Sequence, residues 1–279
     1  MAINLAEKYS NKVVEKFYKE SVILGKTSKK YDWDGVKSIK VWSITTVAPT
    51  NYLRSQALAS GSRYGATTEV EDTIQTMEIT QDKAVSLSVD KGNNTQQMLI
   101  KNAGVVMNHE LREQFVPMFD KYALAEWAEN AGTTTVQASI TKANVVEEIS
   151  NHVTALMNAY ATLDDAYCYI GATNYAKLVL SPEFLHLYEL GNKALDKGVV
   201  GSVRGLKIVP IPDSYLPTGV NFMTVKSSCV LAPTQIKDMK IHQDPPGLSG
   251  ALLEVRWLYD AFVLEAKNKG VVVCKTSNS

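Results

Sequence analysis

Cysteine is scarce in this 279-residue chain, and long apolar runs are absent. The three cysteines (Cys168, Cys229 and Cys274) are far apart and form no CxxC pair. An odd, widely spaced set argues against a disulfide framework and favours a reducing compartment. The amino terminus lacks the apolar core of a signal peptide, and no segment approaches the roughly 18 apolar residues that span a bilayer. We therefore expect a soluble protein that makes no membrane contact.

Residue patterns that mark active sites are also missing. The four histidines lie more than thirty residues apart, so no local metal-binding motif is formed. Gly198, Gly201 and Gly205 share a stretch that matches neither common phosphate-loop pattern, and they favour a flexible loop. The segment from Gly247 to Gly250 is one residue short of a nucleophile elbow and follows two prolines, as a turn would. We predict no catalytic residue, no cofactor and no metal site.

The chain has no net charge, because 29 basic residues balance 29 acidic ones. It therefore has no overall basic field to hold nucleic acid. Residues 1–40 nevertheless carry nine lysines against five acids, an excess of four positive charges. A basic amino-terminal arm on a neutral body could face a polyanion on one side only. The alternative interpretation is an ordinary solvated helix and loop.

The first segment that indicates regular structure runs from Ile3 to Ser21. Leu5, Tyr9, Val13 and Phe17 recur every four residues, which predicts an amphipathic helix. Gly25 and the polar run that follows it end this pattern. The chain is thus expected to begin with an arm whose apolar stripe needs a partner surface.

Residues 36–92 are predicted to form a long β-hairpin arm. Val36 to Val47 is rich in Val, Ile, Trp and Thr, and Thr73 to Asp90 alternates apolar and polar residues. Between them, Asn51 to Asp72 has small residues and weak periodicity, which indicates a mobile loop. The cluster from Lys91 to Asn94 is expected to be a turn. An isolated two-stranded arm is marginal in water, so a neighbouring subunit is expected to cover it.

The rest of the chain mixes helices and strands, so the fold class is predicted to be α+β. Thr95 to Asn130 has a helical pattern that Pro117 should break. Residues 140–240 are expected to be compact, with a helix opened by a capping box at Asn144 to Glu147. Strands are expected at Ala166–Ile170 and Leu206–Ile211, and residues 251–274 are also strand-rich.

Six segments carry a family resemblance through their order and spacing along the chain. These segments are Lys30–Trp42, Arg63–Gly65, Val89–Asn94, Gly198–Pro212, Arg256–Leu264 and Lys269–Val272. They resemble segments of siphophage and prophage capsid proteins with the Hong Kong 97-like fold, and the resemblance covers nearly the whole chain.

The resemblance implies a phage capsid fold made of four regions. Residues 1–50 would be the N-terminal arm, 51–92 the extended β-hairpin loop, 93–135 with 236–279 the peripheral domain with its long spine helix, and 136–235 the axial domain. It implies a major capsid (head) protein that self-assembles as pentamers and hexamers into an icosahedral shell around phage DNA. The implied location is the virion, with assembly in the bacterial host cytoplasm.

The expected partners follow from the same resemblance. Only about fifty residues precede the extended loop, so a separate scaffolding protein is expected in place of a scaffolding extension, together with a portal. Contacts between subunits are expected on the arm, on the extended loop and on the glycine-bearing loop of the middle region. These candidate residues are Leu5, Val13 and Phe17; Arg54, Arg63 and Tyr64; and Gly198, Gly201, Arg204 and Gly205.

Two alternatives remain open. A related shell fold builds bacterial encapsulin-type nanocompartments, and co-purification of a cargo enzyme in place of DNA would identify one. The alternative from another class is a small-molecule enzyme with an unrecognised site. A monodisperse monomer with a tightly bound ligand would favour that enzyme.

Overall fold

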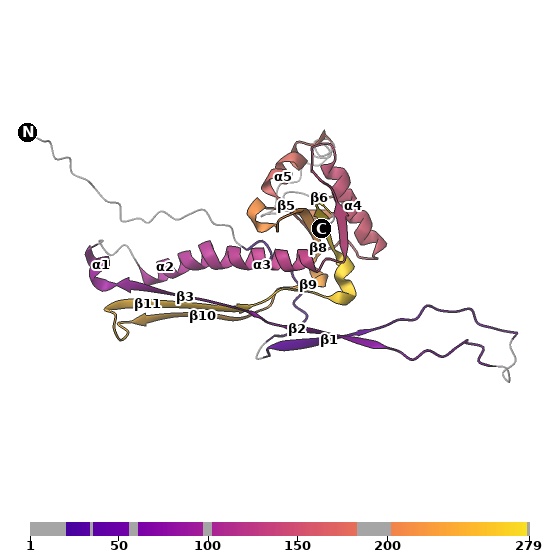
Figure 1. Ribbon diagram of the computed structural model, residues 1–279, viewed down its shortest axis with the longest axis horizontal. Helices are drawn as coiled ribbons and strands as arrows, with labels where there is room; N and C mark the ends of the chain where they lie inside the picture. The colour runs from indigo at the N-terminus through magenta and orange to yellow at the C-terminus, as the bar shows by residue number, and fades with distance from the viewer. Residues whose placement is uncertain (1–20, 34–35, 56–60, 97–101, 183–201, 278–279) are drawn as a thin grey trace, which may run out of the picture. The chain divides into compact units, whose positions relative to one another are not determined.

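The computed structural model describes residues 21–33, 36–55, 61–96, 102–182 and 202–277 (Figure 1). The chain divides into two compact units, which we call the hairpin (Val36–Glu78) and the body (Met1–Gly35 with Ile79–Ser279). None of the described helices is both long enough and apolar enough to cross a bilayer. The predicted arm helix at residues 3–21 lies almost entirely outside the described residues.

The hairpin contains two antiparallel strands, β1 (Ser38–Ile44) and β2 (Asp72–Glu78). Beyond Ile44 the two segments of the hairpin are joined by occasional backbone hydrogen bonds and by contact between the Tyr52 and Tyr64 rings. Thr45 N donates to Glu71 O at 2.9 Å, and Leu53 N donates to Arg63 O at 2.9 Å. The expected strand–loop–strand order is therefore present, with a long non-strand connection.

The longest helical segment of the body changes type beside the predicted proline. Helix α2 (Ala103–Glu110) continues through a π-helical turn, η2 (Leu111–Phe115), into α3 (Val116–Glu129). Pro117 lies in the first turn of α3, where its missing N–H is tolerated, and the wider π turn precedes it. A second helical piece therefore begins beside Pro117, as predicted, but the helix is not interrupted there.

One side of this helix packs on a three-stranded antiparallel sheet with strand order β10-β11-β3 (Figure 1). The strands are β3 (Gln81–Asp90), β10 (Thr234–Gln243) and β11 (Gly250–Tyr259). Phe115 and Phe119 lie 5.4 and 6.2 Å from the ring of Trp257, measured between ring centroids. Alternation along β11 points every second residue at the helix, which is why its burial pattern has a period of two.

The other side of α3 packs on a six-stranded mixed sheet of order β4-β13-β8-β5-β7-β6. Its central strands are continuous apolar runs, as expected for strands that are buried on both faces. The face toward α3 presents Tyr169, Met223 and Val273, among others. The strands are β4 (Thr133–Val136), β5 (Ala166–Gly171), β6 (Ser202–Val203), β7 (Leu206–Ile211), β8 (Val220–Lys226) and β13 (Val271–Lys275).

The opposite face of this sheet is covered by α4 (Val145–Asn158) and α5 (Ala172–Val179). The buried positions of α4 recur at three- and four-residue spacing and form a second core with Cys168, Phe222 and Cys274. The remaining described elements are short: α1 (Lys91–Gln96), η3 (Asp213–Tyr215), η4 (Ser227–Cys229), β9 (Val230–Leu231), β12 (Phe262–Val263) and η5 (Glu265–Gly270).

Three local predictions are wrong. The hairpin does not extend to residue 92, because β3 pairs along its whole length with β11 in the body. Residues Lys91 to Asn94 belong to helix α1 and are not a simple turn. The helix after Asn144 forms as predicted but without the capping box, because the Asn144 carboxamide accepts a hydrogen bond from Thr141 N at 2.7 Å instead. The division into four capsid regions stays a prediction.

Candidate assembly surfaces

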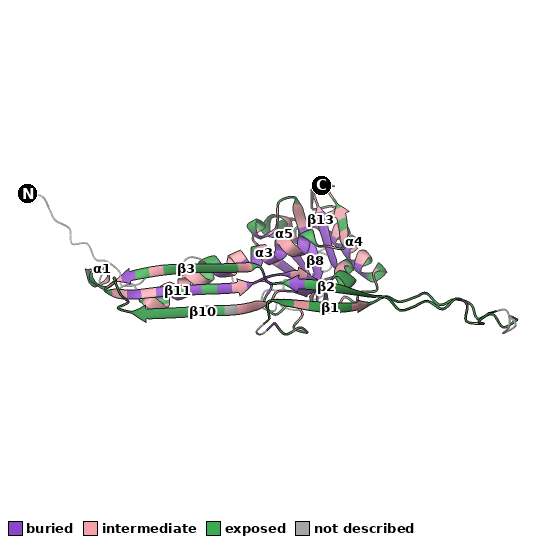
Figure 2. Cartoon of the chain, turned by 60° about the horizontal axis from the view of Figure 1, so that its bottom comes forward, coloured by how far each residue is buried: buried purple, intermediate pink, exposed green. Residues whose placement is uncertain are grey.

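The hairpin presents an apolar face to water. Trp42 pairs with Ile74 across the two strands, and Ile44 lies on the same face. These side chains are 63%, 47% and 70% exposed, respectively. Figure 2 shows most of the described hairpin as exposed. A cluster of large apolar side chains left in water is typical of a surface that another molecule covers.

The three predicted contact residues of the loop lie in the connection between the hairpin strands. Arg54 and Tyr64 are exposed, and the Tyr64 ring packs edge-on against Tyr52 at 5.0 Å between centroids. Tyr64 N donates to the Ser62 hydroxyl at 3.2 Å, and Gly65 N donates to Ser62 O at 3.1 Å. The loop is therefore locally ordered around Ser62, and it offers an aromatic pair and an arginine to a partner.

The three-stranded sheet carries a charged face on the side away from α3. Arg256 donates two hydrogen bonds to the Asp82 carboxylate, at 3.0 and 2.6 Å, and this guanidinium lowers the pKa of Asp82. Lys240 lies 2.8 Å from Asp238, and His242 lies 3.2 Å from Glu254. Positive and negative side chains alternate across the strands. Such a face would fix the orientation of a charged partner more than it would strengthen the binding of that partner.

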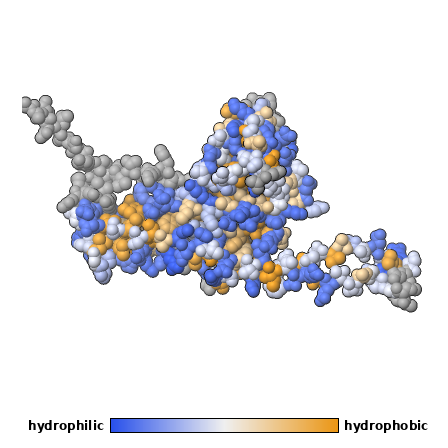
Figure 3. All heavy atoms as spheres, in the orientation of Figure 1, coloured by the Kyte–Doolittle hydropathy of each residue, from blue (hydrophilic) through white to orange (hydrophobic). Residues whose placement is uncertain are grey.

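The outer strand β10 combines an open edge with exposed apolar side chains. Among the described strands β10 pairs only with β11, and Figure 2 shows most of it as exposed. Met239 and Ile241 share the face of the buried Val255 and Leu253 but remain 50% and 42% exposed. Hydrophobic spheres gather in this part of the body in Figure 3. An exposed strand edge with apolar side chains is a ready surface for association.

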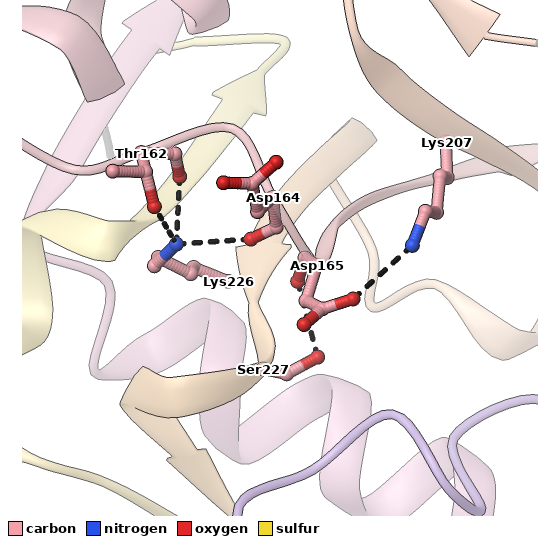
Figure 4. A network of polar contacts seen from close by, with 6 residues as sticks. All are labelled: Thr162, Asp164, Asp165, Lys207, Lys226 and Ser227. Carbon is pink, nitrogen blue, oxygen red and sulfur yellow. Dashed lines mark hydrogen bonds and ion pairs between the residues drawn. The ribbon is translucent and has the colours of Figure 1, made fainter.

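A polar network holds the turn between α4 and β5 in one shape (Figure 4). The Lys226 ammonium donates to Thr162 O, to the Thr162 hydroxyl and to Asp164 O, at 2.7, 2.7 and 2.9 Å. Asp165 accepts from Lys207 at 3.1 Å through its carboxylate and from the Ser227 hydroxyl at 3.1 Å through its backbone oxygen. The fixed turn carries Tyr160, which is 97% exposed. A rigid turn with a solvated aromatic ring can dock against another surface at low entropic cost.

The structure resolves part of the predicted glycine-bearing loop as a tight hairpin turn. Arg204 and Gly205 have φ values of 49° and 89° and connect β6 to β7, with Val203 paired to Leu206. Two successive positive φ values are typical of a type I′ turn, which favours glycine. Arg204 is exposed at its tip. The other predicted contact residues (Leu5, Val13, Phe17, Gly198 and Gly201) lie outside the described residues.

Among the histidines in the described part of the body, His152 has the most strongly shifted pKa. The His152 ring lies between two hydroxyls, with Nδ1 2.9 Å from Thr224 Oγ1 and Nε2 3.1 Å from Thr135 Oγ1. Burial lowers its pKa to about 3, so the ring is neutral at physiological pH. In the described ranges no three His, Cys, Asp or Glu side chains come together as metal ligands would. His152 therefore acts as a core residue with satisfied hydrogen bonds.

Among the comparisons with known proteins, only the comparison with solved structures finds similar proteins. No protein-family model matches the sequence, and no curated protein is similar to it in sequence. Solved structures are similar over nearly the full chain. A structure of Mycobacterium phage Che8 has a TM-score of 0.79 and 18% identity, covering 99% of this chain and 98% of its own.

Two further structures are described as capsids. The capsid structure of Cyanophage P-SCSP1u has a TM-score of 0.74 and 15% identity, covering 98% of this chain and 93% of its own. The mature capsid of bacteriophage PhiM1 has a TM-score of 0.72 and 15% identity, covering 98% and 92%. The fold is that of a phage capsid protein. The predicted α+β phage capsid fold is confirmed.

Proposed function

We propose that the chain is the major capsid protein of a tailed phage and that its copies assemble as pentamers and hexamers into an icosahedral shell. The observation that carries the proposal is that the structural matches cover nearly all of this chain and nearly all of the phage capsid chains. Three structures described as phage capsids each align with 98% of this chain, and the alignments cover 92–99% of their own chains. A fold shared over such a length would supply the same elements from which those shells are built.

The exposed surfaces support the same proposal. Closed shells require association through different surfaces of one chain, arranged so that rotation closes the assembly. The apolar hairpin face, the β10 edge and the Tyr160 turn are three separate exposed surfaces on one chain. The long connection that contains Arg54, Arg63 and Tyr64 would be completed by contact with a neighbour.

Further partners belong to this proposal. The lysine-rich first forty residues would face packaged double-stranded DNA through non-specific phosphate contacts. Leu5, Val13 and Phe17 would supply an apolar stripe to a neighbouring subunit, and Gly198 and Gly201 would lie near a contact in the middle region. A separate scaffolding protein and a portal would take part in assembly in the host cytoplasm, and the product would be the virion shell.

Negative-stain electron microscopy of the purified full chain, alone and with a candidate scaffolding protein, tests the proposal. We expect closed isometric shells, or rings of five and six subunits. A homogeneous monomer or dimer under both conditions would contradict it. Nuclease-protected DNA in shells from infected or induced cells would separate a virion from a nanocompartment, whose shells would instead contain a cargo enzyme.

A further inference from the structure

The open edge of strand β10 presents a defined set of backbone groups. In an antiparallel ladder, alternate residues direct both the N–H and the C=O at the neighbouring strand. Asp244 N donates to Gly250 O at 2.6 Å where the β10–β11 ladder ends, and the ladder is regular from there back to an irregularity at its start. Even-numbered residues of β10 therefore bond to β11. Lys237, Met239 and Ile241 direct their backbone groups at the edge that pairs with no other described strand.

The other neighbour of β11 gives the same alternation. Lys91 N donates to Ser249 O at 2.8 Å, which continues the β11–β3 ladder. Odd-numbered residues of β11 thus bond to β3, which leaves its even-numbered residues, such as Gly250, for β10. The backbone groups on the open edge of β10 are therefore assigned from both sides of β11.

Two oppositely charged residues flank the centre of this strand. Asp238 and Lys240 lie on the charged face of the sheet, on either side of Met239 along the chain, and their charged groups are 2.8 Å apart. Both side chains are partly exposed. A strand with one acid and one base at these positions is complementary to a copy of itself that runs in the opposite direction.

A second copy of β10 fits the edge in an antiparallel register centred on Met239. In this register Asp238 of each copy lies opposite Lys240 of the other. These even-numbered residues would form non-hydrogen-bonded pairs, in which the Cα atoms are about 4.5 Å apart and the side chains are closest. Opposite charges directly across from one another stabilise paired strands. Together with the ion pair inside each strand, they would form a cluster of four charges with alternating signs.

The neighbouring registers bring like charges together. A pairing centred on Asp238 would place two carboxylates opposite each other, and a pairing centred on Lys240 would place two ammonium groups opposite each other. Like charges directly across from one another destabilise paired strands. The charge pattern therefore favours a second copy of this chain as the occupant of the edge, and it favours one register.

The apolar side of the edge is compatible with the same register. The exposed Met239 would contact Met239 of the second copy, and the exposed Ile241 would lie opposite Lys237. Lysines on an edge strand usually oppose pairing. The Lys237 ammonium, however, lies over the Trp257 ring of its own chain, 4.7 Å from the ring centre, so it is directed toward β11. Its aliphatic stem is left to contact Ile241, and the backbones would exchange about six hydrogen bonds.

We propose that β10 is a docking edge for a second copy of this chain, paired antiparallel about a two-fold axis at Met239, and that Asp238 and Lys240 select the register. Such a contact is isologous, because the same residues face each other from both sides. Contacts around a ring of five or six subunits are head-to-tail, so this contact would join different rings of the shell. That location rests on the proposed function, whereas the pairing itself requires only two chains.

Disulfide trapping in the full chain tests the register. Met239→Cys would place two thiols at a hydrogen-bonded pair, with Cα atoms about 5.5 Å apart, which a disulfide can span. Ile241→Cys is the matched control, because it is similarly exposed on the same face but would lie about 14 Å from its counterpart. The native cysteines are buried. Under mild oxidation we expect about tenfold more cross-linked dimer from Met239→Cys than from Ile241→Cys.

The cross-linking is measured both on the dispersed chain at high concentration and on assembled shells. Two strand edges bury little area, so the yield should be lower for the dispersed chain than for shells, which hold copies side by side. Equal yields from Met239→Cys and Ile241→Cys, or no dimer from Met239→Cys in either state, would overturn the proposal. A Met239→Cys thiol that stays unlinked in shells but is protected from maleimide would assign the edge to a different occupant, which would also overturn it.

Charge reversal in the Met239→Cys background tests the role of the ion pairs. Asp238→Lys and Lys240→Asp each place like charges across the axis, so each should lower the dimer yield about tenfold. Mixing the two variants, one with a tag that changes its size, should restore a mixed dimer, because every cross-strand pair is then of opposite sign. The ion pair inside the strand is lost in both variants, so it cannot explain the rescue. A mixture that cross-links no better than either variant would refute charge selection of the register.

Electron microscopy of the Met239→Cys chain separates this inference from the proposed function. If shells form and their subunits do not cross-link, self-pairing fails and the proposed function stands. If no shells form, the proposed function fails, while cross-linking of the dispersed chain still decides whether β10 pairs with itself.

Discussion

His152 should make the protein less stable in acid, because protonating its ring would place a charge in the second core. Burial lowers the pKa of His152 from 6.5 to about 3. A lowered histidine pKa means that the folded state favours the neutral ring, so this stabilisation is complete above pH 6.5 and is lost as the pH falls toward 3. Between pH 8 and pH 6.5 the ring is neutral in both states, so little stability is lost there. Below pH 6.5 each pH unit removes about 1.36 kcal/mol, so acidification from pH 8 to pH 5 should remove about 2 kcal/mol in total.

The assay is urea unfolding of the dispersed chain, followed by tryptophan fluorescence at pH 8 and pH 5. The matched variant is His152→Gln, which stays neutral and keeps a donor and an acceptor for Thr135 and Thr224. Burial raises the pKa values of Asp120 and Glu126, and such groups contribute stability at low pH that is lost as the pH rises through their folded values. Their effects have the opposite sign to that of His152, and they cancel when the two proteins are compared.

We expect the wild type to lose about 2 kcal/mol more than His152→Gln over this pH range. At pH 8 the variant should be the less stable protein, because glutamine fills the space beside Phe222 less well than imidazole does. Equal pH dependence in the two proteins would refute the reasoning. It would mean that the ring is hydrated, or that it already rearranges to solvent without unfolding.

Two further predictions concern the hairpin and a strand end. Changing Trp42 and Ile74 to threonine should leave the free energy of unfolding within about 0.5 kcal/mol, because both side chains are largely exposed, while shell yield falls sharply. Lys40→Gln on the same face is the control, and an equal loss of shells from it would argue against an apolar contact. Gly250→Ala should cost about 3 kcal/mol in urea unfolding, because an added Cβ would lie 2.1 Å from Val89 O. Gly247→Ala, with positive φ but no atom within 4 Å, should cost only about 1 kcal/mol, and equal costs would exclude the predicted clash.

The elements that local periodicity specifies were predictable from the sequence. Strand β7 has the predicted bounds, Leu206–Ile211, because a short, mainly apolar segment between a turn and a proline is typical of a buried strand. The start of α3 beside Pro117 follows from one missing N–H group, which the first turn of a helix tolerates. Helix α4 follows from apolar residues at three- and four-residue spacing. In each case the determining interaction spans a few residues.

Pairing between distant segments could not be predicted in this way. Strand β3 has the same alternating pattern as β2, but it leaves the hairpin and pairs with β11 about 170 residues further on. Backbone hydrogen bonds are alike for any two strands, so an alternating pattern shows that one face is buried without showing against what. The sequence did place Arg54 and Tyr64 in the loop between the hairpin strands, where the structure has them.

The hydrogen bonds that join Thr80 and Tyr122 to the Asp260 carboxylate gave no local signal in the sequence. Thr80 and Asp260 are 180 residues apart, and neither has a motif that distinguishes it from an ordinary polar residue. By itself the sequence determined the fold class, the order of the elements and the resemblance to phage capsid proteins, because these depend on local patterns and their sequence order. Only the tertiary structure decided that Trp33, Thr80 and Tyr122 meet at one turn, because such a meeting depends on how both sheets pack around α3.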